Sequence, residues 1–67
     1  MLKHDKLYKL IQSTEFAEIV TSAETFTIKN NQIIIDNRDT THILKSREDL
    51  EQIKNEDTLD YLLIKLS

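Results

Sequence analysis

The chain has 67 residues and contains no Gly, Pro, Cys or Trp. Without Gly it lacks the glycine-rich loops that bind phosphate groups, and without Cys it has no disulfides, thiolate nucleophiles or Cys-based zinc sites. Its 9 basic and 12 acidic residues give a net charge of −3, whereas most nucleic-acid-binding domains have a basic surplus. The length predicts one domain, residues 1–67, with a core too small for a substrate pocket. We therefore expect no enzymatic activity and no cofactor.

The apolar segments of the sequence bear on where the protein is located. No apolar run is long enough to span a membrane, and the first residues lack the apolar segment of a signal peptide. The abundance of Ile, Lys and Asn beside the scarcity of Ala and Arg is typical of AT-rich genes. We expect a cytoplasmic protein from a bacterium or phage of low GC content, acting in the host cytoplasm if it is phage-encoded.

Two helical patterns come first along the chain. Residues 5–12 carry three apolar side chains at helical spacing, and residues 16–23 carry a second such set. The two apolar stripes point to nearly opposite sides, so we expect one helix or two helical pieces rather than one straight helix. The alternative for residues 16–22 is a strand, because Ile, Val and Thr favour extended structure.

The middle of the chain predicts an antiparallel hairpin. Asn30 and Asn31 separate two segments rich in β-branched residues. Asn tolerates the positive φ angles that a two-residue type I′ turn requires, and it is the best substitute where Gly is absent. The pairs that this turn brings together on one face are Ile28 with Ile33 and Phe26 with Ile35.

A second turn over residues 37–40 returns the chain as a third strand over residues 41–44. A two- or four-residue loop places Ile43 opposite Ile34, on the face away from Phe26. We expect the first helix to cover these two isoleucines with its apolar side chains. If they are uncovered, they form an interface with a partner or a second copy.

The last third of the chain predicts a short helix and a final strand. Ser46 and Asp49 fit the capping-box pattern, which predicts a helix of about two turns. Residues 59–66 match both helical spacing and strand alternation, and we predict a strand because the segment is short. The expected fold is a small single-domain α+β protein with an N-terminal helix or two helical pieces, a three-strand antiparallel meander, a short capped helix and a C-terminal strand.

The two histidines are the only side chains that invite a catalytic or metal-binding hypothesis. His42 lies near Asp36 and Asp39, and His4 lies beside Asp5. A solvated strand end and the start of a helix explain both positions. No serine lies in the strand–turn–helix context of a nucleophile with an oriented base. We predict no catalytic residue, no metal site and no cofactor site.

Two surfaces are candidates for binding a partner. The acidic one consists of Glu48, Asp49, Glu51, Glu56, Asp57 and Asp60, and the apolar one of Ile34 and Ile43. An acidic surface would bind a basic patch on another protein, although a solvated helix and loop also explain these carboxylates. We predict a small protein-binding module, a regulator or inhibitor of phage or mobile-element type that binds a host protein. The alternatives are a self-associating homo-oligomeric subunit and a nucleic-acid-binding regulator that uses the lysines of the first helix.

Overall fold

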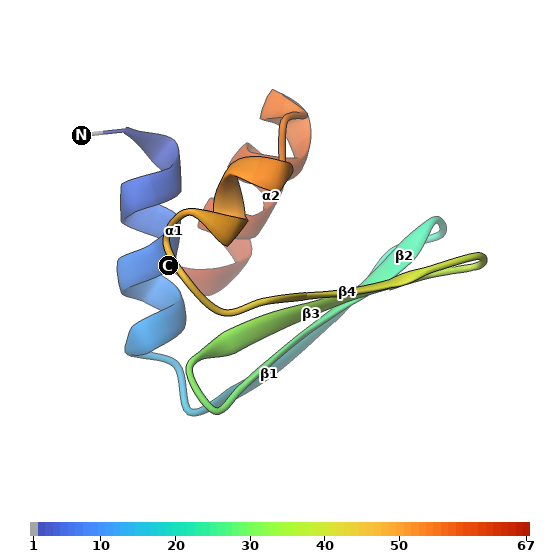
Figure 1. Ribbon diagram of the computed structural model, residues 1–67, viewed down its shortest axis with the longest axis horizontal. Coiled ribbons are helices and arrows are strands. Elements are labelled where there is room, and N and C mark those ends of the chain that lie inside the picture. The colour runs from blue at the N-terminus through green and yellow to red at the C-terminus, as the bar shows by residue number, and fades with distance from the viewer. Residues whose placement is uncertain (1) are drawn as a thin grey trace.

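The structure is a computed structural model that describes residues 2–67 (Figure 1). Its elements, in chain order, are α1 (Lys3–Gln12), β1 (Phe16–Val20), β2 (Glu24–Lys29), β3 (Gln32–Asn37), β4 (Thr41–Leu44), the 3₁₀ turn η1 (Asp49–Gln52) and α2 (Glu56–Leu66). The four strands form one antiparallel sheet in the order β1-β2-β3-β4. The fold is a small α+β domain, which confirms the predicted class.

The central hairpin has the predicted turn and register. Asn30 and Asn31 have φ angles of 52° and 62°, as a type I′ turn requires. The predicted pairs are both present, Ile28 with Ile33 and Phe26 with Ile35. Because the side-chain period of a strand is two, this one turn decides which residues of β2 and β3 reach the core.

The second predicted turn is also confirmed. The side-chain oxygen of Asn37 accepts hydrogen bonds from the backbone N–H groups of Asp39 and Thr40 at 2.9 and 2.8 Å. The chain then returns as β4, which places Ile43 opposite Ile34. An asparagine therefore makes this turn as well, through its side chain rather than through a positive φ.

Residues 16–23 do not form the predicted helix, and the strand alternative is correct. β1 pairs with β2 along its whole length. Thr21 closes the turn between them, since its hydroxyl accepts from the N–H of Glu24 at 2.9 Å and donates to the carbonyl of Glu24 at 2.8 Å. A helix of this length is marginal alone, whereas pairing with β2 satisfies the backbone groups of β1. The meander has four strands instead of three.

The predicted C-terminal strand is wrong, because residues 59–66 belong to α2. The side-chain oxygen of Asn55 accepts from the N–H groups of Asp57 at 2.8 Å and Thr58 at 3.2 Å, so it caps the helix before the apolar segment begins. This cap lengthens the element to 11 residues. At that length the helical spacing of the leucines favours a helix over a strand. Leu59 and Leu62, on one face of α2, are buried.

The short helix predicted after Ser46 is a single 3₁₀ turn, η1. The reciprocal hydrogen bonds of the predicted capping box are present in the turn that leads into η1: Ser46 Oγ accepts from the N–H of Asp49 at 3.1 Å, and Asp49 Oδ2 accepts from the N–H of Ser46 at 3.2 Å. The backbone becomes extended at Ile53, with φ −83° and ψ 101°. The predicted second turn of this helix does not form, because the chain must reach the start of α2 at Asn55.

The core lies between the helices and one face of the sheet, here called the inner face (Figure 1). Its buried residues are Leu7, Ile11, Ile19, Phe26, Ile28, Ile33, Ile35, Leu44, Leu50, Ile53, Leu59 and Leu62. Both helices cover this same face, so α1 does not cover Ile34 and Ile43 as we expected from the sequence. No helix within residues 2–67 has the length and hydropathy needed to cross a membrane.

Candidate partner-binding site

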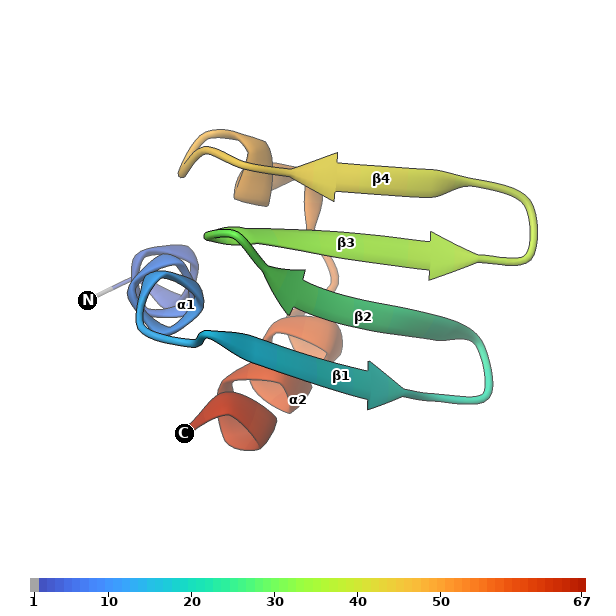
Figure 2. The same cartoon turned by 90° about the horizontal axis from the view of Figure 1, so that it is seen from below.

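The face of the sheet opposite the helices, here called the open face, is covered by no element of residues 2–67 (Figure 2). Side chains alternate along each strand, and the register assigns this face its residues. They are Phe16, Glu18, Val20, Thr25, Thr27, Lys29, Gln32, Ile34, Asp36, Thr41 and Ile43. The open face therefore combines apolar, hydroxyl and charged side chains.

Four apolar side chains lie on the open face. Phe16, Val20 and Ile43 are 63%, 66% and 50% exposed. Ile34 is half-buried beside Ile43, its partner across the strands. An antiparallel sheet with one solvated face normally carries polar residues on that face. The packing of the domain does not account for these four residues.

Two opposite charges lie among these apolar residues. Glu18 lies between Phe16 and Val20 on β1, and Lys29 is the cross-strand partner of Phe16. Neither Glu18 nor Lys29 belongs to an ion pair within residues 2–67. Both charges are therefore available to groups outside the domain.

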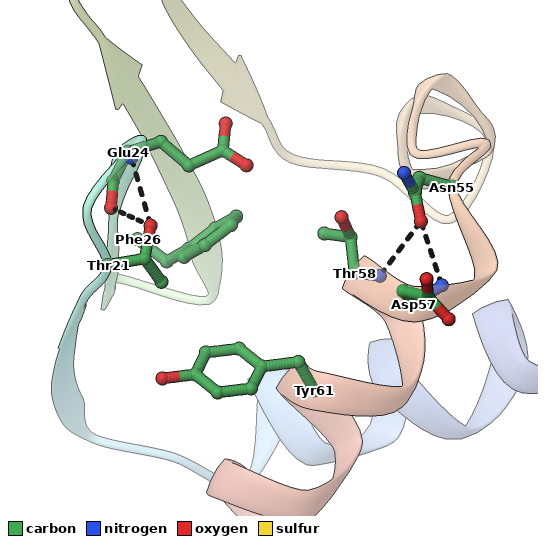
Figure 3. Close-up of a pocket in the computed structure, with 7 residues that line it drawn as sticks. All are labelled: Thr21, Glu24, Phe26, Asn55, Asp57, Thr58 and Tyr61. Atoms are coloured by element: carbon green, nitrogen blue, oxygen red, sulfur yellow. Dashed lines mark hydrogen bonds between the residues drawn. The ribbon is translucent and has the colours of Figure 1, made fainter.

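A groove lies between the end of the sheet and the start of α2 (Figure 3). It is a cavity of about 430 Å³ lined by Thr21, Glu24, Phe26, Asn55, Asp57, Thr58 and Tyr61. Two smaller hollows, of about 180 and 100 Å³, continue it across the inner face toward His42. The groove exists because the turn ends of the sheet extend past the helices (Figure 1).

The six acidic residues predicted as a contact surface fall into two groups. Glu48, Asp49 and Glu51 lie at η1, and Glu56, Asp57 and Asp60 lie on α2. Lys3 of α1 pairs with Glu56 at 3.3 Å and with Asp60 at 2.8 Å. Hydrogen bonds to Asp60 and then Glu56 raise the pKa of Lys3. These two carboxylates already have a cation inside the domain.

The carboxylates at η1 are also largely engaged. Arg47 Nη1 lies 3.2 Å from Glu51 Oε2. The backbone N–H groups of Lys45 and Ser46 donate to Asp49 and lower the pKa of Asp49. Glu48 makes no side-chain hydrogen bond or ion pair within residues 2–67. The acidic residues thus serve the helix ends and ion pairs of the fold, and four of the six are neutralised or hydrogen-bonded there.

Neither histidine is hydrogen-bonded to the aspartates near it in sequence. His4 Nε2 is 2.8 Å from the carbonyl oxygen of Ile53, and Arg47 pairs with Asp5. His42 Nε2 is 3.3 Å from the hydroxyl of Thr40 and not bonded to a carboxylate. No cluster of three or more His, Asp and Glu side chains in the described part of the chain is placed to hold a metal ion.

Sequence reasoning identified two of the four apolar residues of the open face. Ile34 and Ile43 follow from the register of the meander. Phe16 and Val20 were not predicted as surface residues of a sheet, because they are four residues apart. That spacing fits one face of a helix as well as one face of a strand. The groove could not be foreseen, since it needs α2 to be a helix. Comparisons of the chain with protein-family models, curated proteins and solved structures give no match.

Proposed function

We propose that the protein is a small, non-enzymatic binding module that regulates or inhibits another protein, with the open face as its contact surface. The observation that supports this most is the bare side of the sheet, where Phe16, Val20 and Ile43 are at least half exposed. Exposed apolar side chains interspersed with polar and charged ones on one face are typical of protein–protein contact surfaces. The core is filled by other residues, so these apolar side chains add to the sheet through strand propensity and cross-strand pairing and remain exposed for contact.

The open face is a better candidate than the acidic residues. Glu56, Asp60 and Glu51 already form ion pairs within the domain, and a partner would have to replace those contacts. Covering Ile34 and Ile43 instead makes the free energy of association more favourable, because it removes apolar surface from water.

We propose that the partner on the open face is a different protein with an apolar surface, a Lys or Arg opposite Glu18 and a carboxylate opposite Lys29. Neither Glu18 nor Lys29 has an ion-pair partner within residues 2–67, and an unpaired charge is costly to cover. Two-fold symmetry can also place Glu18 against Lys29 of a second copy, so a measurement of the oligomeric state is part of the test.

Affinity capture from a lysate of the source cells tests this proposal. The baits are the tagged parent chain, Ile43→Glu on the open face, and the control Glu48→Gln at η1. We expect one protein to be captured by the parent and by Glu48→Gln, and reduced at least about tenfold with Ile43→Glu, the scale on which a central interface residue acts. Circular dichroism checks that all baits are folded.

Two results would overturn the proposal. The first is capture of the same proteins in the same amounts by the parent and by Ile43→Glu. The second comes from light scattering across a range of concentrations. A dimer of the parent chain that Ile43→Glu abolishes would show that a second copy occupies the open face.

A further inference from the structure

We infer that the groove between the sheet and α2 binds the guanidinium side chain of an arginine-containing peptide. The groove opens on the inner side of the sheet, away from the open face, so this inference does not rest on the function proposed above. It is an open groove of about 430 Å³, which is enough to hold one long side chain.

Two aromatic rings form the apolar part of the groove (Figure 3). Phe26 is 2% exposed and forms only the closed wall of the groove, so Tyr61 of α2, which is 36% exposed, is the ring that a ligand can reach. Aromatic rings attract cations through the negative charge over their faces, and a planar guanidinium can also stack on them. Within the domain, Lys65 Nζ lies 5.5 Å from the centroid of the Tyr61 ring. A guanidinium bound in the groove would therefore stack on the part of this ring that Lys65 leaves uncovered, and the carboxylates of the groove must supply most of the attraction.

The charged groups that line the groove are both carboxylates, Glu24 and Asp57. Neither carboxylate makes an ion pair or a hydrogen bond within residues 2–67. In Figure 3 the carboxylate of Glu24 extends across the groove toward α2. A guanidinium has several N–H donors and no acceptor, so it complements these oxygens.

The helix N-terminus in the groove does not favour an anion instead. The N–H groups of Asp57 and Thr58 would attract a negative group if they were free. Both donate to the side-chain oxygen of Asn55, at 2.8 and 3.2 Å. The cap thus removes the donors that an anion would use and leaves the carboxylates as the strongest polar groups.

The adjoining hollows favour a peptide over a free cation, because they give room for the residues on either side of the arginine. The hollow next to the groove also contains Glu24 and Phe26, and the one beyond it is lined by Ile35, Leu44 and Ile53. Lys54 lines the middle hollow and would repel a cation there. The guanidinium is therefore expected in the groove itself, next to Tyr61. The apolar remainder can hold the neighbouring residues of the peptide.

The probe for this site is N-acetyl-arginine amide, compared with N-acetyl-citrulline amide, which has nearly the same shape but no charge. We expect the arginine probe to shift the amide NMR signals of Glu24, Thr58 and Tyr61, with the citrulline probe at least about tenfold weaker. Glu24→Gln should weaken arginine binding by about fivefold or more. The control Glu18→Gln, on the open face, should leave it unchanged.

Glu24→Gln is expected to fold, since the Thr21 turn uses only the backbone N–H and carbonyl of Glu24. Equal binding of the two probes would overturn the inference. Shifts confined to another surface, such as Glu51 or Asp60, would also overturn it, as would unchanged arginine binding in folded Glu24→Gln. The capture experiment with Ile43→Glu is independent of each of these outcomes.

Discussion

Both faces of the sheet carry Phe and Ile, but in opposite environments. On the inner face, Phe26 and Ile33 are 2% and 0% exposed, whereas on the open face Phe16 and Ile43 are 63% and 50% exposed. Ile34 follows Ile33 directly in the chain and yet points to the other side of the sheet. An apolar residue in a strand of this protein therefore belongs to the core or to the surface according to its place in the register. The apolar residues left over by the fold are those that point to binding.

The largest expected difference between the faces is in stability. Phe26→Ala should lower the free energy of unfolding by ~3–5 kcal/mol, the usual cost of truncating a buried Phe. Phe16→Ala should change it by about 0.5 kcal/mol or less, as at other exposed positions. Urea unfolding measures both. A small domain has only about 3–5 kcal/mol in total, so Phe26→Leu is the variant to measure if Phe26→Ala does not fold. Equal losses for Phe26 and Phe16 would break the comparison.

A smaller effect is expected at the helix that covers the inner face. Asn55→Ala removes the acceptor for the N–H groups of Asp57 and Thr58 and should cost about 1 kcal/mol. Asn55→Asp keeps a capping oxygen and should retain most of the stability. Thermal unfolding by circular dichroism compares the two variants. If Asn55→Asp lost as much stability as Asn55→Ala, the cap would not be what fixes α2.

The smallest effect concerns acid. Hydrogen bonds from the N–H groups of Lys45 and Ser46 lower the pKa of Asp49 below its ordinary value of 3.8. A lowered pKa means that the folded state favours the charged form, so this contribution is fully present above pH 3.8 and is lost as the pH falls through the lower, folded-state value. Asp49→Asn should therefore show a shallower loss of stability between pH 5 and pH 2 than the parent chain. Parallel curves for the two proteins in urea unfolding would contradict this role of Asp49.

Local chemistry made the centre of the fold predictable. Two asparagines at positive φ fix the hairpin, and its period of two then assigns Ile28 and Ile33 to the core and Ile34 to the other face. The reciprocal hydrogen bonds between Ser46 and Asp49, in the turn before η1, were likewise predictable from these two residues. These features depend on residues that are close in sequence.

Two segments fit both a helix and a strand in the sequence, and their surroundings decide between them. Residues 16–23 have helical spacing, but β2 offers their backbone a partner, so the strand alternative is correct. Residues 59–66, predicted as a strand, are helical because the cap at Asn55 starts α2 at Glu56. The open face could not be predicted for the same reason. No sequence pattern indicates that α1 and α2 pack on the same side of the sheet.

The most direct test of the open face is methyl cross-saturation NMR on the isoleucines, with the partner obtained by capture. Saturating the partner should weaken the methyl signals of Ile34 and Ile43 and leave those of Ile28 and Ile33, which lie on the inner face, unchanged. These two pairs are chemically identical and differ in the side of the sheet on which they lie. Full intensity at Ile34 and Ile43 in the saturated complex would contradict the assignment of the open face as the contact surface.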